Sequence, residues 1–225
     1  MTRIVVFVFG LFVSLTACNA QNSASVNSKT NRIEKEMGDT VTQLGDSLWY
    51  IYQDTKNNFW FGSNGEGVFY YDGKTILNFT TKHGLSSDSV RQIKEDEFGN
   101  MYFSTLGGIN KFDGKKITAL QALKSNDWKI EEKDLWFFML GKKGEHGPYR
   151  YDGKNLYNLQ FPKHYLHDEF YTRGINPFFS PYEIYTIHKD RKGAMWFGTS
   201  VFGACRFDGQ SIKWMYEEDL TIVPN

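Results

Sequence analysis

Two histidines, His164 and His167, are the most chemically suggestive pair in this chain. Histidines at this spacing can share a metal ion if the segment turns helically, because neutral imidazole is a good zinc ligand. Asp168 and Glu169 follow directly and add two carboxylates. The sequence fixes no third ligand, however, and an exposed loop with satisfied polar groups also explains the pattern. We therefore predict no metal and no cofactor here.

The same histidines belong to a long link, Phe161–Pro181, that also carries Tyr171 and Arg173. These two side chains are suited to stack on a ligand or to hydrogen-bond it. A long segment without secondary structure is often functional. Alternatively, the link only fills a gap left by an irregular neighbouring repeat. The candidate ligand-binding residues are Tyr171, Arg173, His164, His167, Asp168 and Glu169.

Elsewhere the sequence offers little for catalysis. Cys205 lies between Ala204 and Arg206 in an apolar stretch with no histidine beside it, which favours a small buried hydrophobe over a nucleophile. The carboxylate pair Glu131–Glu132 is adjacent in sequence, so a strand would point the two groups to opposite faces. The sequence contains no nucleophile elbow, phosphate loop or zinc-protease motif. We predict no catalytic residues.

Four repeats must position these groups. Each contains an aromatic run and then an aromatic residue followed by Asp-Gly, and the Asp-Gly pairs begin at 72, 113, 152 and 208, which are 41, 39 and 56 residues apart. A period near 40 residues with aromatic strands is typical of propeller blades. The repeat-defining residues are Trp60, Tyr102, Trp136, Trp196, Asp72, Gly73, Asp113, Gly114, Asp152, Gly153, Asp208 and Gly209.

The predicted fold is all-β: a β-propeller of about four four-stranded blades with almost no helix. The second-strand aromatic of each repeat should be largely buried between neighbouring blades. Each Asp-Gly pair should form a tight hairpin turn in which both residues have positive φ. The blades form either a closed small ring or an arc or fragment of a larger propeller. In the closed form, Val41–Leu44 would pair as a strand of the last blade.

Three acidic loops, which begin at Asp54, Asp96 and Asp190, resemble calcium loops only superficially. None has the length or the number of oxygen ligands that a calcium loop needs, so we interpret them as hairpin turns.

The N-terminus has the features of an export signal. Arg3 precedes an apolar run, Ile4–Leu15, which is too short to span a bilayer. The following Leu15-Thr16-Ala17-Cys18 resembles the lipobox of bacterial lipoproteins, which implies cleavage before Cys18 and a lipid attached to its thiol. An ordinary secretory signal is the alternative. We divide the chain into a signal peptide (1–17), a flexible tether (18–32) and a propeller domain (33–225). Asn19 after the cysteine favours the outer membrane.

The repeats also resemble a known family. The run Trp196-Phe197-Gly198-Thr199, the Tyr-Asp-Gly-Lys turn and the link His83–Val90 are similar to two-component regulator propeller repeats. The resemblance covers about 47–216, and the third repeat departs from it. It implies an envelope sensor-type propeller and implies nothing enzymatic.

Charge is balanced, with 26 basic and 26 acidic residues, so the sequence gives no reason to expect a nucleic-acid partner. The best prediction is a lipid-anchored, non-enzymatic propeller in the bacterial envelope, facing the periplasm or the cell surface. Its partners would be the bilayer, through Cys18, and an unknown small molecule, glycan or envelope protein. The alternatives are a propeller lyase or hydrolase that acts on a glycan or antibiotic-like substrate, and a structural envelope component.

Overall fold

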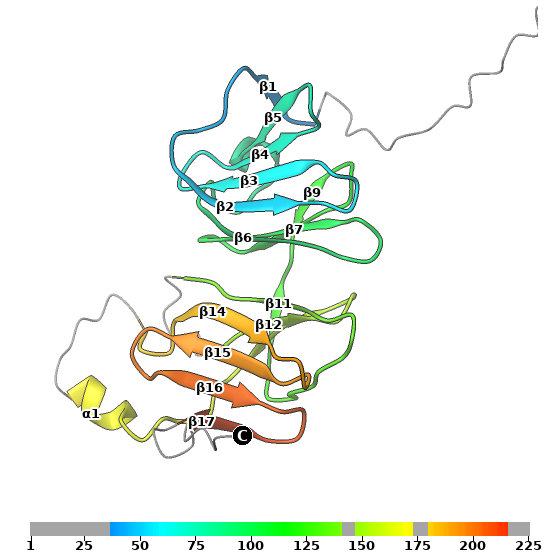
Figure 1. Cartoon of the computed structure of the whole chain (residues 1–225). Coiled ribbons are helices and arrows are strands. Elements are labelled where there is room, and N and C mark those ends of the chain that lie inside the picture. Colours follow the sequence, from blue (N-terminus) through cyan, green and yellow to red (C-terminus); the bar gives the residue numbers. More distant parts are fainter. Residues whose placement is uncertain (1–36, 141–146, 173–179, 216–225) are drawn as a thin grey trace, which may run out of the picture. The chain divides into compact units, whose positions relative to one another are not determined.

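A computed structural model describes residues 37–140, 147–172 and 180–215. These residues belong to one compact unit, Ile33–Asn225. They form four successive β-sheets (Figure 1). The first sheet contains β1 (Asp39–Val41), β2 (Leu48–Gln53), β3 (Phe59–Ser63), β4 (Val68–Tyr71) and β5 (Ile76–Phe79). The second contains β6 (Val90–Glu95), β7 (Met101–Thr105), β8 (Ile109–Phe112) and β9 (Ile117–Ala119).

The third and fourth sheets follow in the same order along the chain. The third contains β10 (Ala122–Ser125), β11 (Leu135–Phe137), β12 (Tyr149–Tyr151) and β13 (Leu156–Leu159). The fourth contains β14 (Ile184–Lys189), β15 (Met195–Thr199), β16 (Ala204–Phe207) and β17 (Ile212–Met215). The repeats therefore form antiparallel meanders, as the sequence predicts for propeller blades.

The N-terminal strand does not close a ring. β1 pairs antiparallel with β5, so it extends the outer edge of the first sheet instead of joining the last blade, and the prediction for Val41–Leu44 is wrong. The pairing sets Val41 opposite Ile76, which adds apolar contact at that edge. Within the described ranges, no strand pairing links the first sheet to the fourth, and the sheets form an open series.

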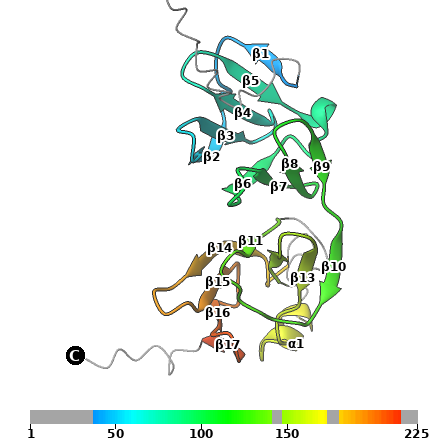
Figure 2. The same cartoon turned by 90° about the vertical axis from the view of Figure 1, so that its right-hand side faces the viewer.

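The third sheet is irregular, as its sequence indicates. Among the residues that the structure describes, it lacks a first inner strand like those that begin the other three sheets. Instead, β10 pairs in parallel with β13 at the outer edge, a strand that the repeat pattern does not predict (Figure 2). Trp128 contributes to the core here, because its ring lies 5.3 Å from Phe207 and 5.7 Å from Phe197.

Helical structure is confined, among the described residues, to a short 3₁₀ helix, η1 (Thr81–His83), and one α-helix, α1 (His167–Thr172). The second lies inside the long link that we expected to be a loop. Thus the link is partly structured, but α1 begins at His167 and does not include His164.

The acidic hairpin loops are turns, as predicted. In each loop, one oxygen of the first aspartate accepts hydrogen bonds from the backbone N–H groups two and four residues later in the chain. These bonds stabilise the turn. The other oxygen accepts a bond from the second-strand aromatic. That distance is 2.9 Å in each pair: Trp60 to Asp54, Tyr102 to Asp96 and Trp196 to Asp190.

The Asp-Gly turns differ from the prediction. In each turn only the glycine has a positive φ angle. The aspartate side chain stabilises the turn instead, as in the first repeat, where Asp72 Oδ1 accepts hydrogen bonds from the backbone N–H groups of Lys74 (2.9 Å) and Thr75 (2.7 Å). Four residues, not two, separate the paired Tyr71 and Ile76. The glycine φ angles are 89° at Gly73, 87° at Gly114, 92° at Gly153 and 94° at Gly209. Only glycine takes this conformation without strain.

Consecutive sheets pack through a repeated aromatic contact. The second-strand aromatic of one sheet is buried against a phenylalanine in the second strand of the next sheet. The ring centroids are 5.6 Å apart for Trp60 and Phe103, 6.0 Å for Tyr102 and Phe137, and 5.7 Å for Trp136 and Phe197.

Trp196 is the exception to the predicted burial. Trp60, Tyr102 and Trp136 are buried, whereas Trp196 is only partly buried. Its strand register sets it opposite His188 and Arg206, on the face of the fourth sheet away from the third-sheet core. Within the described residues no fifth sheet follows to cover that face, which explains the difference.

Candidate functional site

The link before the fourth sheet is held by residues that enter the core. Phe161 and Phe170 belong to the hydrophobic cluster shared by the third and fourth sheets. His164 is also buried, and its ring stacks on Phe202 at 4.3 Å with an interplanar angle of 6°. This burial disfavours the charged imidazolium and lowers the pKa of His164. The inner side of the link therefore completes the core, in agreement with the gap-filling alternative.

The two histidines are engaged separately. His164 Nδ1 accepts the N–H of Leu166 at 3.1 Å, while His167 Nδ1 lies 2.8 Å from the hydroxyl of Tyr182. Within 37–140, 147–172 and 180–215, no three His, Cys, Asp or Glu side chains converge in a way that could hold a metal ion. The geometry thus gives these histidines structural partners.

The outer side of the link presents aromatic and acidic groups. Tyr165 is 70 % exposed and Tyr171 is 49 % exposed. Asp168 and Glu169 are exposed in α1, and Asp168 forms an ion pair with Lys163 at 2.8 Å. Sequence reasoning missed Tyr165, because its exposure follows from the burial of His164, which depends on contacts far along the chain. Of the predicted candidates, Arg173 lies outside the described residues.

We name the surface formed by Tyr165, Asp168, Glu169 and Tyr171 the link surface. Phe161, His164 and Phe170 are buried and hold the backbone of this segment, and the ring of Tyr165 lies 4.7 Å from that of His164. The ring of Tyr171 lies 4.8 Å from that of His167, which restricts its rotation. Such preorganised aromatic groups bind with little loss of conformational entropy. The arrangement suits a ligand or peptide with a flat apolar part and hydrogen-bond donors.

A second feature, not predicted from the sequence, is an open hollow of about 690 Å³ at one end of the first sheet. The segment 42–45 and Phe69 line it, together with Glu66 and Asp88. Both carboxylates already accept backbone hydrogen bonds, from Asp46 and Thr81 respectively. The two carboxylates of the hollow are therefore held by backbone N–H groups of segments that flank strands of the first sheet.

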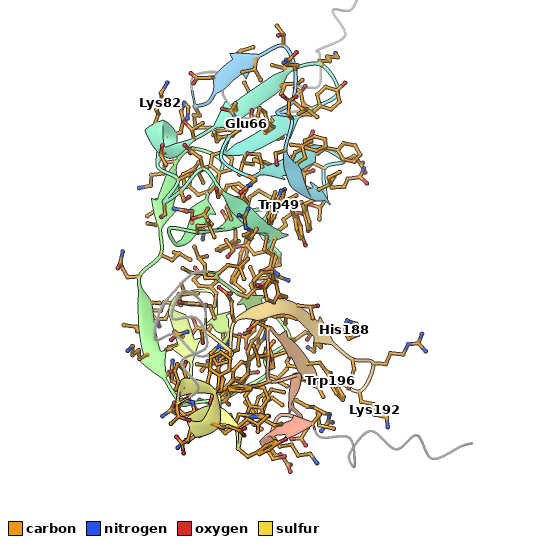
Figure 3. The ribbon with its side chains drawn as sticks, turned by 90° about the vertical axis from the view of Figure 1, so that its left-hand side faces the viewer. Trp49, Glu66, Lys82, His188, Lys192 and Trp196 are labelled. Atoms are coloured by element: carbon orange, nitrogen blue, oxygen red, sulfur yellow. The ribbon has the colours of Figure 1, made fainter. Side chains whose placement is uncertain are left out.

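The first and fourth sheets each carry a notable exposed aromatic or basic group on their inner strands. Trp49 on β2 is 56 % exposed and stacks under the guanidinium of Arg91 at 4.0 Å. On the fourth sheet, His188 and Trp196 come from neighbouring strands, and Lys192 extends from the hairpin that joins them (Figure 3).

Cys205 is a buried core residue, as its sequence context indicates. It is fully buried, and burial raises the pKa of its thiol to about 12. A thiol with such a pKa is almost wholly protonated at neutral pH and is a poor nucleophile.

Among the described residues, none of the helices is long and apolar enough to span a bilayer.

Comparisons with known proteins agree on the fold. The model of the two-component regulator propeller family matches residues 179–201. No curated protein matches the chain significantly. The extracellular domain of a hybrid two-component system from B. thetaiotaomicron superposes with a TM-score of 0.52 and 17 % identity over 78 % of this chain. Virginiamycin B lyase from Staphylococcus aureus, solved with quinupristin, gives a TM-score of 0.54 and 16 % identity over 77 %.

The chain spans only part of each of these proteins. It covers 24 % of the two-component extracellular domain and 56 % of the lyase. At these identities the likeness establishes a propeller-type fold.

Proposed function

We propose that this protein is a non-enzymatic binding module of the bacterial envelope, which recognises a ligand or a protein through the link surface. The single observation that carries the proposal is the division of roles within the link: Phe161, His164 and Phe170 are buried anchors, whereas Tyr165 and Tyr171 are displayed to solvent. Gap-filling alone accounts for the anchors but not for two exposed tyrosines beside two acidic side chains.

Binding is favoured over catalysis by the state of the titratable groups. His164 is buried with a lowered pKa, and His167 is bonded to Tyr182. Neither is presented as a free base toward the exposed tyrosines. Aromatic and polar groups on a fixed surface, by contrast, are what recognition of a glycan or peptide requires.

The location is inferred from the sequence and supported by the kind of protein that shares the fold. Leu15–Cys18 resembles a lipobox, and one of the structural neighbours is an extracellular domain of a two-component system. We propose that the chain is exported and held by lipid on Cys18, in the outer membrane, with its propeller domain facing the periplasm or the cell surface.

Site-specific photocrosslinking tests the binding role. A photoreactive amino acid replaces Tyr171 in the full chain, produced in the source bacterium, and a second strain carries it at Tyr165. Phe98, which is 81 % exposed on a hairpin of the second sheet, is the matched control position. We expect a discrete adduct from Tyr165 and Tyr171 that is absent from Phe98.

A thermal-shift screen with oligosaccharides covers the case of a small ligand. A compound that binds the folded chain raises its melting temperature by mass action, and replacement of Tyr165 and Tyr171 by serine should remove that shift without lowering the unliganded melting temperature. If no adduct forms at either tyrosine and no compound shifts the melting temperature, the proposed binding role is refuted.

A further inference from the structure

The two terminal sheets carry faces that match each other. Ile51 is 62 % exposed and Phe59 is 36 % exposed on the first sheet. The equivalent positions of the second sheet, Ile93 and Met101, are 0 % and 2 % exposed, because the first sheet covers them. The equivalence follows from the register: Ile51 pairs with Phe61 as Ile93 pairs with Phe103. The exposed face of the first sheet is therefore equivalent to the face of the second sheet against which the first sheet packs.

The fourth sheet has the opposite kind of face. In all three internal contacts, the second-strand aromatic of one sheet lies within 6.0 Å of a phenylalanine of the next. Trp196 holds that aromatic position in the fourth sheet, including the 2.9 Å bond to its aspartate. Phe61 holds the receiving position in the first sheet. The fourth sheet thus presents a face that inserts a tryptophan, and the first sheet presents a face that accepts one.

Charged groups of both signs lie near the two faces. Arg206 and Lys213 share the face of Trp196, since the three are paired across neighbouring strands, and Arg206 forms an ion pair with Asp208 at 3.1 Å. On the first sheet, Arg91 stacks on the exposed Trp49 at 4.0 Å, and Glu66 lines the hollow at one end. The match between the two faces therefore rests on their aromatic and apolar positions.

We propose that two copies of this chain associate head to tail, with the Trp196 face of each packed on the Ile51, Phe59 and Phe61 face of the other. A contact between unlike faces closes into a ring when the rotation permits, and otherwise continues as a filament. The described residues of two copies supply eight sheets, a number within the range of closed propellers. The pair satisfies both terminal faces in one symmetric assembly.

An internal contact defines the test. Thr55 in the first hairpin of sheet one bonds Glu95 of sheet two, through Oγ1 to Oε1 at 2.7 Å and through its N–H to Oε2 at 2.8 Å. Arg191 is the fourth-sheet equivalent of Thr55, because each directly follows the aspartate of its first hairpin. Gln53 is the first-sheet equivalent of Glu95, because each directly precedes that aspartate. Arg191 of one copy should therefore meet Gln53 of the other.

The experiment uses the full chain with the double substitution Arg191→Cys and Gln53→Cys, purified and treated with a mild oxidant. Both positions are exposed, so the fold should be unaffected. We expect a dimer that is covalently joined at two sites and is cleaved by reductant. The controls are the parent chain, each single substitution, and the pair Val201→Cys with Gln53→Cys, in which Val201 lies at the other end of the strands of the fourth sheet.

Each other outcome overturns the proposal. A disulfide within one chain would show that the chain closes on itself. A ladder of higher oligomers would show an open filament, and free thiols after oxidation would show that the faces do not meet. As a second measurement, Ile51→Glu should weaken dimerisation by more than roughly tenfold in sedimentation equilibrium, whereas Phe98→Glu should not. Equal dimerisation of the two variants contradicts the assigned face.

Discussion

Replacement of equivalent tryptophans should have unequal effects on stability. Trp60 and Trp196 occupy the same repeat position and make the same 2.9 Å bond to an aspartate. Trp60 is 1 % exposed and lies 4.7 Å from Tyr70 and 5.6 Å from Phe103. Trp196 is only partly buried. Since the lost hydrogen bond is common to both variants, the difference between them measures the burial between sheets.

We expect Trp60→Ala to lower the free energy of unfolding by about 3–5 kcal/mol, the usual cost of removing a buried aromatic ring. Trp196→Ala should cost about half as much, because less of its ring leaves water on folding. For a domain of this size, 1 kcal/mol corresponds to about 2–4 °C in melting temperature, so Trp60→Ala should melt roughly 6–20 °C below the parent.

Thermal and urea unfolding, followed by far-ultraviolet circular dichroism, provides the measurement. Trp60→Phe and Trp196→Phe are the milder matched pair, since each keeps one aromatic ring and loses the indole N–H together with part of the ring volume. Protein concentration is kept low enough that the chain is monomeric. Equal losses from Trp60→Ala and Trp196→Ala under those conditions would refute the assignment of a covered and an uncovered face.

Three further predictions concern single residues. The lowered pKa of His164 means that the unfolded chain binds this proton more tightly; stability should be fully present above about pH 6.5 and fall as the pH drops through the folded pKa, and His164→Asn should flatten that part of the urea-midpoint profile. Cys205 should react with a thiol reagent only after denaturant is added, and modification of the native protein at pH 7 would contradict its burial. Cys18→Ser should prevent incorporation of labelled palmitate and release the chain from membranes; an unlabelled parent that still sediments with membranes would show that lipid is not the anchor.

The sequence predicts the sheets well because each repeat carries its own local instructions. An aspartate that bonds a hairpin, an aromatic strand and a glycine with positive φ recur at fixed spacing, and all three act over a few residues. Three details could not be predicted in this way. β1 pairs with β5 instead of the last blade, and this pairing joins segments that are distant in sequence. β10 adds the fourth strand of the third sheet at the outer edge, beside β13, and not at the inner edge. Trp196 lies between an apolar residue and a phenylalanine, as its equivalents do, and its lower burial follows from what covers its face of the sheet.

The candidate site shows the same limit. Spacing alone identified the histidines of the link and the possibility of a helical turn, and α1 does form at His167–Thr172. Which side of the link faces the core depends on contacts with Phe202, Tyr182 and Trp214, which lie far along the chain. The sequence therefore placed His164 among ligand-binding candidates, whereas its contacts make it an anchor.

The proposed dimer contact repeats a contact inside the chain, whereas the proposed link surface does not. The proposed dimer contact has three internal precedents, so its geometry can be transferred position by position from Trp60 and Phe103 to Trp196 and Phe61. The role of the link surface is inferred from the exposure of Tyr165 and Tyr171 beside the buried His164 and Phe170. The two are also separable, because the link residues belong to the segment before the fourth sheet and the dimer residues to strands β2, β3 and β15. Loss of dimerisation by Ile51→Glu should therefore leave crosslinking at Tyr171 intact.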